Sequence, residues 1–358
     1  MVIASGVRKS TLPEGRKTVS PQEAWGTGLV RQNWVGFSSI IACVDGSPNS
    51  VEVLAWATML SRSLNASLRT LHVLEWPSTE APQDPLAWEL RRRDAQSRIE
   101  ALLEQAGVDE INEDVLEVAV GSFQDRLQER LSESLVDLCV IGAVGEGTQP
   151  GGFISGTTRR VVETSPCSVL IVPPRKSDAG VGTASVRRLM VPLDCSRRAE
   201  IALPAAVALA DACGAEIVII HAVPEPAITE VAPPDDADIE LIKNVTERNH
   251  KVADRYISRL RARLALERRS IRALIVSGDE PRHQLVRTAQ DEEADLIVLS
   301  AKGAGGYTDQ ALGSVADFLV THLSKPLLIL RPGPDRKPRS AANLHNTEPG
   351  EKLNRGRA

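Results

Sequence analysis

Two stretches of this sequence, IIACVDGS at residues 40–47 and LMVPLDCS at residues 189–196, have the same pattern. Each is a mostly apolar run that ends at an aspartate, followed by a helical pattern rich in alanine, at about residues 50–64 and 198–213. Short continuous apolar runs are typical of strands that are buried on both faces of a parallel sheet. The match predicts that one strand–turn–helix unit occurs twice in the chain.

The elements that follow also occur in the same order in both halves. In the first half, strands are expected at residues 67–73, 115–120, 137–142 and 169–172, with a long helix at 86–105; in the second half, the corresponding strands are at 216–223, 271–276, 295–300 and 327–330, with a helix at 238–266. Strict alternation of strands and helices predicts right-handed βαβ units and a parallel sheet with helices on both faces. The predicted fold class is α/β, as two tandem five-stranded parallel-sheet sandwiches.

The chain of 358 residues is long enough for two domains. Segments rich in glycine, serine, proline and charge, without periodicity, predict disordered tails at residues 1–37 and 333–358. A similar stretch near the midpoint predicts a linker at 174–186. The predicted domains are residues 38–173 and 187–332.

The composition argues against several classes of partner. A net charge of −5 gives no general attraction for nucleic acid or anionic membranes, so we expect neither as a partner. The N-terminal residues lack the pattern of a secretory signal, and no apolar run approaches the roughly 20 residues of a membrane span. The five cysteines form no CxxC pair, which favours reduced thiols and therefore a cytoplasmic location.

Each fourth strand is followed by a glycine-rich loop. The candidate binding residues of these loops are Gly142, Gly145, Ser155, Gly156 and Thr157 in the first half, and Ser300, Gly303, Gly313 and Ser314 in the second. Glycine lets backbone N–H groups approach a polyphosphate, and a hydroxyl residue at the next helix start adds a donor where the helix dipole favours anions. The alternative is a turn without a ligand, in which Ser155 or Ser314 is only a helix N-cap.

The turns after the first strands are the second set of candidates. Open parallel sheets bind ligands at the carboxyl ends of the strands, where the winding reverses. Asp45 and Gly46 in the first half, and Asp194 in the second, follow strands at that point. The alternative is that both aspartates cap their own turns.

These pieces together resemble the universal stress protein family over about residues 38–172 and 187–331. Besides the aspartate turns, the resemblance rests on VSGDEP at 276–281 leading to ADLIVL at 294–299, and on SPCSVLIV at 165–172 or SKPLLIL at 324–330. ATP-binding members carry G-x2-G-x9-G-S/T after strand four. The resemblance implies that the turn aspartate and the exit of strand two, here Val73 and Ala222, line an adenosine pocket. It also implies a Rossmann-like, adenine-nucleotide α-hydrolase-like fold whose halves pack through their last strands as an intramolecular pseudo-dimer.

Neither loop matches the family motif at every position. The second half keeps the spacing but has Ser300 for the first glycine and Cys195 for the turn glycine. In the first half, a gap-free register reverses the final pair to Ser155-Gly156, whereas a loop one residue longer would use Gly156-Thr157. The gap-free register is preferred because it keeps one offset, 158, from Asp137–Asp295 through Ser168–Pro326. Glu146 puts a carboxylate near the first loop and Lys302 a cation near the second, so the second half is expected to be the better phosphate site.

The expected function is binding of ATP, with or without Mg²⁺, in a stress-response role and without efficient catalysis. The sequence has no GxSxG elbow or HExxH helix, although slow ATP turnover stays open. His72 and His221, near the ends of the second strands, are expected to be structural, since one histidine per site does not make a metal site.

A homodimer is expected. The competing hypothesis is a nucleotide-independent scaffold that acts through oligomerisation or partner binding. An ATP-using enzyme of the related superfamily is disfavoured because the Ser-Gly-Gly-x-Asp-Ser loop is missing.

Overall fold

The computed structural model describes residues 36–75, 85–108, 111–112, 114–133, 136–145, 154–174, 184–226, 235–265, 271–278, 280–304, 310–322 and 324–331. Nearly all of the predicted tails, and most of the predicted linker, lie outside the described residues. Phe37, which the sequence placed in the N-terminal tail, is buried against the first domain with 6% of its surface exposed.

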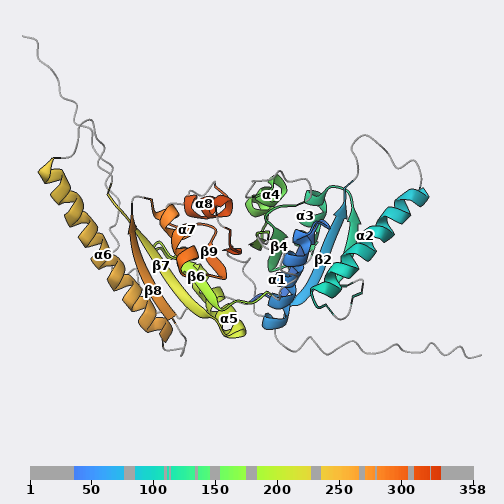
Figure 1. Cartoon of the computed structure of the whole chain (residues 1–358), viewed down its shortest axis with the longest axis horizontal. Coiled ribbons are helices and arrows are strands. Elements are labelled where there is room, and N and C mark those ends of the chain that lie inside the picture. The colour runs from blue at the N-terminus through green and yellow to red at the C-terminus, as the bar shows by residue number, and fades with distance from the viewer. Residues whose placement is uncertain are drawn as a thin grey trace, which may run out of the picture. The chain divides into compact units, whose positions relative to one another are not determined.

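The first half has the predicted order of elements (Figure 1). These are β1 (Ser39–Val44), α1 (Asn49–Leu64), β2 (Ser67–Leu74), α2 (Pro85–Gln105), β3 (Leu116–Val120), α3 (Phe123–Glu133), β4 (Leu138–Gly142), α4 (Gly156–Thr164) and β5 (Ser168–Val172). Helix α1 is followed by its C-cap residue, Asn65, which has a left-handed backbone (φ 52°), as is common just after the end of a helix.

The second half repeats this order. Its elements are β6 (Arg188–Pro192), the 3-10 turn η1 (Ala199–Ile201), α5 (Ala202–Cys213), β7 (Glu216–Pro224), α6 (Asp236–Ala265), β8 (Ile271–Gly278), α7 (Pro281–Asp291), β9 (Leu296–Ser300), α8 (Ser314–His322) and β10 (Leu327–Leu330). The helix predicted at 198–213 is therefore divided into η1 and α5. Pro204 explains the division, because it has no N–H with which to bond the carbonyl four residues earlier.

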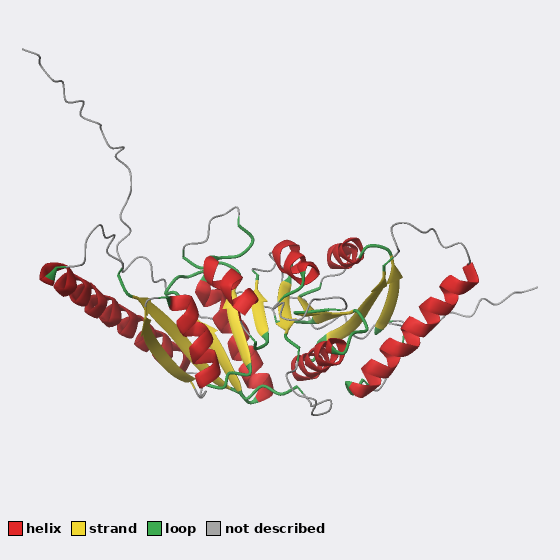
Figure 2. Ribbon diagram, turned by 45° about the horizontal axis from the view of Figure 1, so that its top comes forward, coloured by secondary structure: helices red, strands yellow, loops and turns green. Residues whose placement is uncertain are grey.

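The strands form a single ten-stranded sheet in the order β3-β2-β1-β4-β5-β10-β9-β6-β7-β8. All neighbours are parallel except β5 and β10, which pair antiparallel. Figure 2 shows helices on both faces of the strands in each half. Each half thus has the doubly wound order 3-2-1-4-5, and the winding reverses between the first and fourth strands. The predicted α/β fold is confirmed.

The two halves join through their last strands, as the family resemblance implied. In the β5–β10 ladder, Leu170 lies opposite Leu328, and both residues hold the same position in their own half. An approximate two-fold axis therefore passes between them. Because β5 and β10 cover each other, an intermolecular dimer would use other surfaces, and the expected homodimer stays a prediction.

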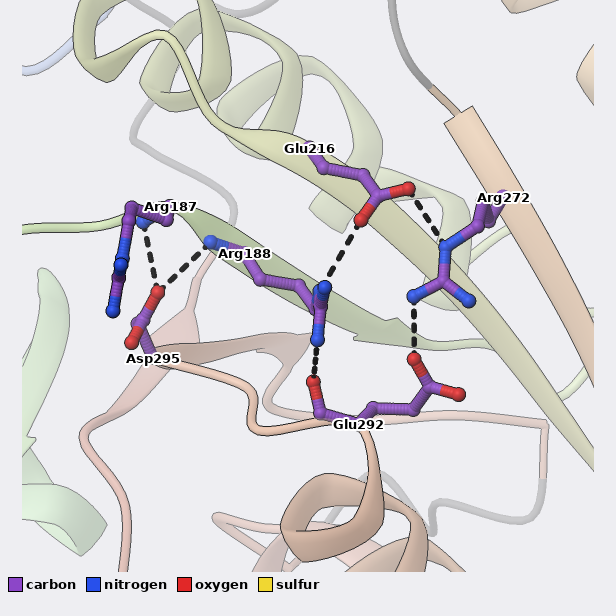
Figure 3. Close-up of polar contacts among 6 residues, drawn as sticks. All are labelled: Arg187, Arg188, Glu216, Arg272, Glu292 and Asp295. Carbon is purple, nitrogen blue, oxygen red and sulfur yellow. Dashed lines mark hydrogen bonds and ion pairs between the residues drawn. The ribbon is translucent and has the colours of Figure 1, made fainter.

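An ion network marks the amino-terminal ends of the strands of the second half. Figure 3 shows the Glu216 carboxylate between two guanidinium groups, 3.2 Å from Arg188 Nε and 2.7 Å from Arg272 Nε. Arg272 also pairs with Glu292. The Asp295 carboxylate accepts hydrogen bonds from the backbone N–H groups of Arg187 and Arg188. These groups fasten β6 to β7, β8 and β9 at the edge opposite the candidate ligand site.

An aspartate also joins two segments at the same edge of the first half. The Asp137 carboxylate accepts hydrogen bonds from the backbone N–H groups of Ser38 and Ser39, as the Asp295 carboxylate does from those of Arg187 and Arg188.

Of the helices in the described part of the chain, none is long and apolar enough to cross a membrane.

Candidate functional site

A cavity of about 580 Å³ opens at the carboxyl ends of β1 and β4, where the winding of the first half reverses. A cavity of this size is typical of a small-molecule site. Of the residues predicted from the sequence, those that line it are Asp45, Val73, Gly142, Gly145, Ser155 and Thr157. The structure thus brings together the turn after β1, the exit of β2 and the glycine-rich loop. We call this cavity the first cleft.

The turn after β1 is held by its own aspartate. Asp45 Oδ1 accepts hydrogen bonds of 3.0 Å from the Ser47 backbone N–H and from the Ser50 hydroxyl. Gly46 has φ +81°, a conformation that residues with a Cβ rarely adopt. The proposed capping role of Asp45 is therefore real, and the same residue also lines the first cleft.

The glycine-rich loop passes directly over this aspartate. A Cβ built on Gly145 would lie 2.4 Å from Asp45 Oδ2, which is closer than such atoms can approach. A Cβ on Gly142 would lie 2.6 Å from Asn49 Nδ2. Both glycines are therefore required by close packing of the loop against the start of α1 and the β1 turn.

The start of α4 closes the loop. Ser155 is the N-cap, and its hydroxyl accepts a 3.0 Å hydrogen bond from the Thr158 backbone N–H. The Thr158 hydroxyl donates to the Gly142 carbonyl at 2.7 Å, which ties the helix start to the end of β4. Gly156 is exposed, and a Cβ there would meet nothing within 4 Å.

The structure supports the gap-free register between the two loops. Ser155 N–H donates to the Ala143 carbonyl at 2.7 Å, and Gly313 N–H donates to the Ala301 carbonyl at 2.8 Å. The helices that follow, α4 and α8, have nine residues each. Ser155 therefore corresponds to Gly313, and the exposed Gly156 corresponds to Ser314.

Helix α2 supplies a wall of the first cleft that the sequence reasoning missed. Arg91, Asp94 and Arg98 line the cavity, and the Arg98 side chain lies over Gly46, with its Cδ 3.6 Å from the position of a Cβ on that glycine. The sequence analysis did not single out Arg98 and Asp94. The three residues follow a spacing of i, i+3 and i+7, which places them on one helical face.

The two histidines at the strand ends have structural partners. The His72 side chain is buried, and its Nδ1 lies 2.9 Å from the Val44 carbonyl oxygen. His221 Nδ1 lies 2.7 Å from the Leu193 carbonyl oxygen in the same way. Each ring links the second strand to the end of the first, which fits the structural role expected for both. Among the described residues, no cluster of three or more acidic, histidine or cysteine side chains is arranged to hold a metal ion.

The turn of the second half repeats the first with one strained residue. Asp194 Oδ1 accepts from the Ser196 backbone N–H at 3.0 Å, and Oδ2 accepts from the Ala304 backbone N–H at 2.6 Å. A Cβ on Gly303 would lie 2.2 Å from Asp194 Oδ2, so this glycine has the role of Gly145. Cys195 replaces Gly46 and has φ +63°, which is unfavourable for a residue with a Cβ.

Protein side chains gather around the turn of the second half. The buried Tyr256 of α6 donates a 3.0 Å hydrogen bond to Glu200, whose carboxylate also pairs with Arg263 at 2.8 Å. Burial, and then the charge of Glu200, raise the pKa of Tyr256.

Cys195 Sγ lies 3.6 Å from His221 Nδ1. Burial, followed by the charges of Asp194 and Glu200, raises the pKa of Cys195 to about 11, so its thiol is protonated at neutral pH.

The remaining candidates of the second half occupy their predicted elements. Gly313 is buried, and a Cβ built on it would lie 3.5 Å from the Gly303 backbone nitrogen. Ser314 is exposed at the start of α8, and Ala222 pairs with Val276 in the β7–β8 ladder.

Comparison with known proteins identifies both halves. The model of the universal stress protein family matches residues 36–173 and 185–331. Universal stress protein Rv2623 of Mycobacterium tuberculosis is 25% identical over 305 residues, which cover 82% of this chain and 96% of the relative. Universal stress protein Rv2005c of the same organism is 22% identical with the same coverage. A crystal structure of a universal stress protein from Archaeoglobus fulgidus, 19% identical, covers 82% of this chain and 98% of its own with a TM-score of 0.56, a likeness of fold. This chain, with two matched domains in tandem, belongs to the universal stress protein family.

Proposed function

We propose that this protein binds ATP as its magnesium complex in the first cleft, and acts in a stress response without efficient catalysis. The observation that carries the proposal is the 580 Å³ cavity at the switch point of the first half, with the glycine-rich loop over Asp45 on one side. Loops of this kind present backbone N–H groups to phosphates, and the amino end of a following helix favours anions.

The charges of the first cleft favour a magnesium complex over the bare nucleotide. Its lining has three carboxylates (Asp45, Glu75 and Asp94) and two guanidinium groups (Arg91 and Arg98). A free triphosphate would be repelled by the excess of carboxylates, whereas a bound Mg²⁺ reduces its charge. The two arginines remain available to attract the outer phosphates.

The proposal places the nucleotide in the first half, against the expectation from loop spacing. In the second half, Tyr256, Glu200 and Arg263 bond to one another beside the Cys195 turn. A nucleotide there would have to displace interactions that the protein makes with itself.

Binding without efficient turnover is supported by the role of Asp45, a carboxylate of the cleft lining. Its Oδ1 accepts two hydrogen bonds, from the Ser47 backbone N–H and the Ser50 hydroxyl, so this oxygen has no free lone pair with which to act as a general base.

One variant in each half tests the proposal. Thr157→Glu adds a carboxylate at the exposed start of α4, on the lining of the first cleft, and Ser314→Glu adds one at the exposed start of α8. With Mg-ATP at about 100 times its dissociation constant, the wild-type protein and Ser314→Glu should gain about 2.7 kcal/mol of stability. Thr157→Glu should lose most of this gain while keeping the melting temperature of the free protein.

Calorimetric titration with Mg-ATP gives the affinities directly. A wild-type protein that shows neither heat of binding nor thermal shift at millimolar Mg-ATP would contradict the proposal and favour the nucleotide-independent scaffold. Loss of binding in Ser314→Glu alone would move the site to the second half.

A further inference from the structure

One side chain, Asn49, joins three parts of the first cleft. Asn49 is the first residue of α1 and only 9% of its surface is exposed. Its Nδ2 donates to the Val144 carbonyl in the glycine-rich loop at 3.2 Å, and lies 3.5 Å from the Val172 carbonyl at the end of β5. The side chain therefore connects α1, the glycine-rich loop and the last strand of the first half.

Asn49 and Gly142 fit each other as a pair. A Cβ on Gly142 would lie 2.6 Å from Asn49 Nδ2 and 3.0 Å from the Val144 carbonyl oxygen. Gly142 does not have a positive φ, so the need for glycine comes from this contact and not from backbone strain. A larger residue at 142 would push Asn49 away from the carbonyl it holds.

In the second half, different residues stand at the positions that correspond to Asn49 and Gly142. Arg198 follows the turn aspartate by four residues, as Asn49 does, and its side chain is exposed. Ser300 stands where Gly142 stands, at the end of the fourth strand. The described non-glycine residues with positive φ are Asn65, Cys195 and Glu293, so Ser300 has ordinary backbone angles.

The carbonyl that Asn49 holds in the first half has a different hydrogen-bond donor in the second half. Lys302 corresponds to Val144, and its carbonyl accepts from the Ser300 hydroxyl of its own loop. The Val144 carbonyl of the first loop is thus held by a buried amide of α1, whereas the corresponding Lys302 carbonyl accepts from a hydroxyl of its own loop. The two halves therefore differ at both positions of the pair and also at the donor to this carbonyl.

We propose that Asn49 is a positioning residue, which holds the glycine-rich loop of the first half where its N–H groups can donate to the phosphates of ATP. The inference rests on the proposed function. Asn49 itself need not touch the nucleotide. Its contribution is the fixed position of the Gly142–Gly145 segment, since a mobile loop would have to be ordered at the moment of binding.

The first experiment tests the pair without nucleotide. Urea unfolding of Gly142→Ser, Asn49→Ala and the double variant forms a double-mutant cycle. Gly142→Ser should lower the unfolding midpoint strongly in the wild-type background. It should lower the midpoint less in the Asn49→Ala background, where the contact with Asn49 Nδ2 is gone and only the 3.0 Å approach to the Val144 carbonyl oxygen remains. Additive effects would overturn the proposed fit of the pair.

The second experiment tests positioning by comparing two ligands. Asn49→Leu keeps a side chain of similar size but removes the amide donor to the Val144 carbonyl, without adding a charge to the lining of the first cleft. The variant should bind Mg-ATP about tenfold more weakly, a change of about 1.4 kcal/mol, and adenosine with nearly unchanged affinity. A merely structural role would weaken both ligands together, because the folded population would fall for both.

Asn65→Gly is the matched control at the other end of α1. Its left-handed backbone suits glycine, so ATP affinity should stay at the wild-type value. Equal losses for ATP and adenosine in Asn49→Leu, or an unchanged ratio of the two affinities beside normal wild-type binding, would overturn this inference alone. Wild-type protein that binds neither ligand would overturn the proposed function as well.

Discussion

Arg159 and Asp317 hold the same position in the two halves, the fourth residue of α4 and of α8, and they form an ion pair with each other at 2.7 Å. Leu170 and Leu328 show the same relationship in the β5–β10 ladder. In a dimer of identical subunits, a residue beside the two-fold axis faces its own copy, so a charge there meets a like charge. The tandem chain escapes this constraint because its halves have separate sequences.

Charge reversal at this position should be corrected by a second reversal. Arg159→Asp places two carboxylates face to face and also removes the Arg159–Glu163 pair within α4. The cost should be about 1 kcal/mol or less because all three side chains are more than 40% exposed. The swapped double variant Arg159→Asp/Asp317→Arg should recover most of the loss in urea unfolding at low salt. A double variant no more stable than Arg159→Asp would contradict a direct interaction.

Glycine-to-alanine changes at Gly46 and Gly156 should have opposite effects on stability. Gly46 has φ +81°, and a left-handed conformation costs a residue with a Cβ roughly 1–2 kcal/mol. Gly156 lies in the first turn of α4 with open space around it, so alanine should stabilise by up to about 1 kcal/mol. Thermal unfolding of the two variants checks the signs. A destabilised Gly156→Ala would mean that the start of α4 needs backbone freedom.

The ion network of the second half should make its stability depend on salt. Glu216→Gln leaves Arg188 and Arg272 without the carboxylate between them, and should cost about 1 kcal/mol at low salt. The loss should shrink at high salt because these groups are partly exposed and screened. The control is Glu247→Gln, which removes an exposed pair with Lys251 at 3.9 Å and should change little. Equal losses in both variants would contradict a network contribution.

Alkaline pH should destabilise the protein through its buried thiols. Burial is the main cause that raises the pKa of Cys167 from 9.0 to about 12. The folded-state pKa is raised, so this stability is fully present below pH 9 and is lost as the pH rises toward 12. One such group lowers the free energy of unfolding by up to about 1.4 kcal/mol per pH unit in this window.

Cys167→Ala isolates that contribution. Under reducing conditions, urea unfolding at a series of pH values from about 8 to about 11 should show a shallower decline for Cys167→Ala than for the wild-type protein. Cys213→Ala removes a half-buried thiol and should change the slope less. Parallel declines for wild type and Cys167→Ala would exclude this thiol as the cause.

The sequence indicated the elements of the fold and the loops that meet at the first cleft. Short apolar runs, aspartate turns and glycine-rich loops are local patterns, and their repetition in the same order predicted two doubly wound halves. The constant offset of 158 residues predicted that Ser155 corresponds to Gly313. Arg159 and Asp317, which form an ion pair, are separated by the same 158 residues. The α2 wall was missed because arginines on a polar helix resemble any solvated face.

Local pattern alone determined the tandem α/β architecture, because each strand and turn is specified by its own few residues. Only the tertiary structure decided which side chains meet around the turn of each half. Asn49 meets the Val144 carbonyl 95 residues away, and Tyr256 meets Glu200 56 residues away. Such contacts depend on side-chain shape and burial between distant segments. The glycine spacing favoured the second loop, whereas the packing around it favours the first cleft as the binding site.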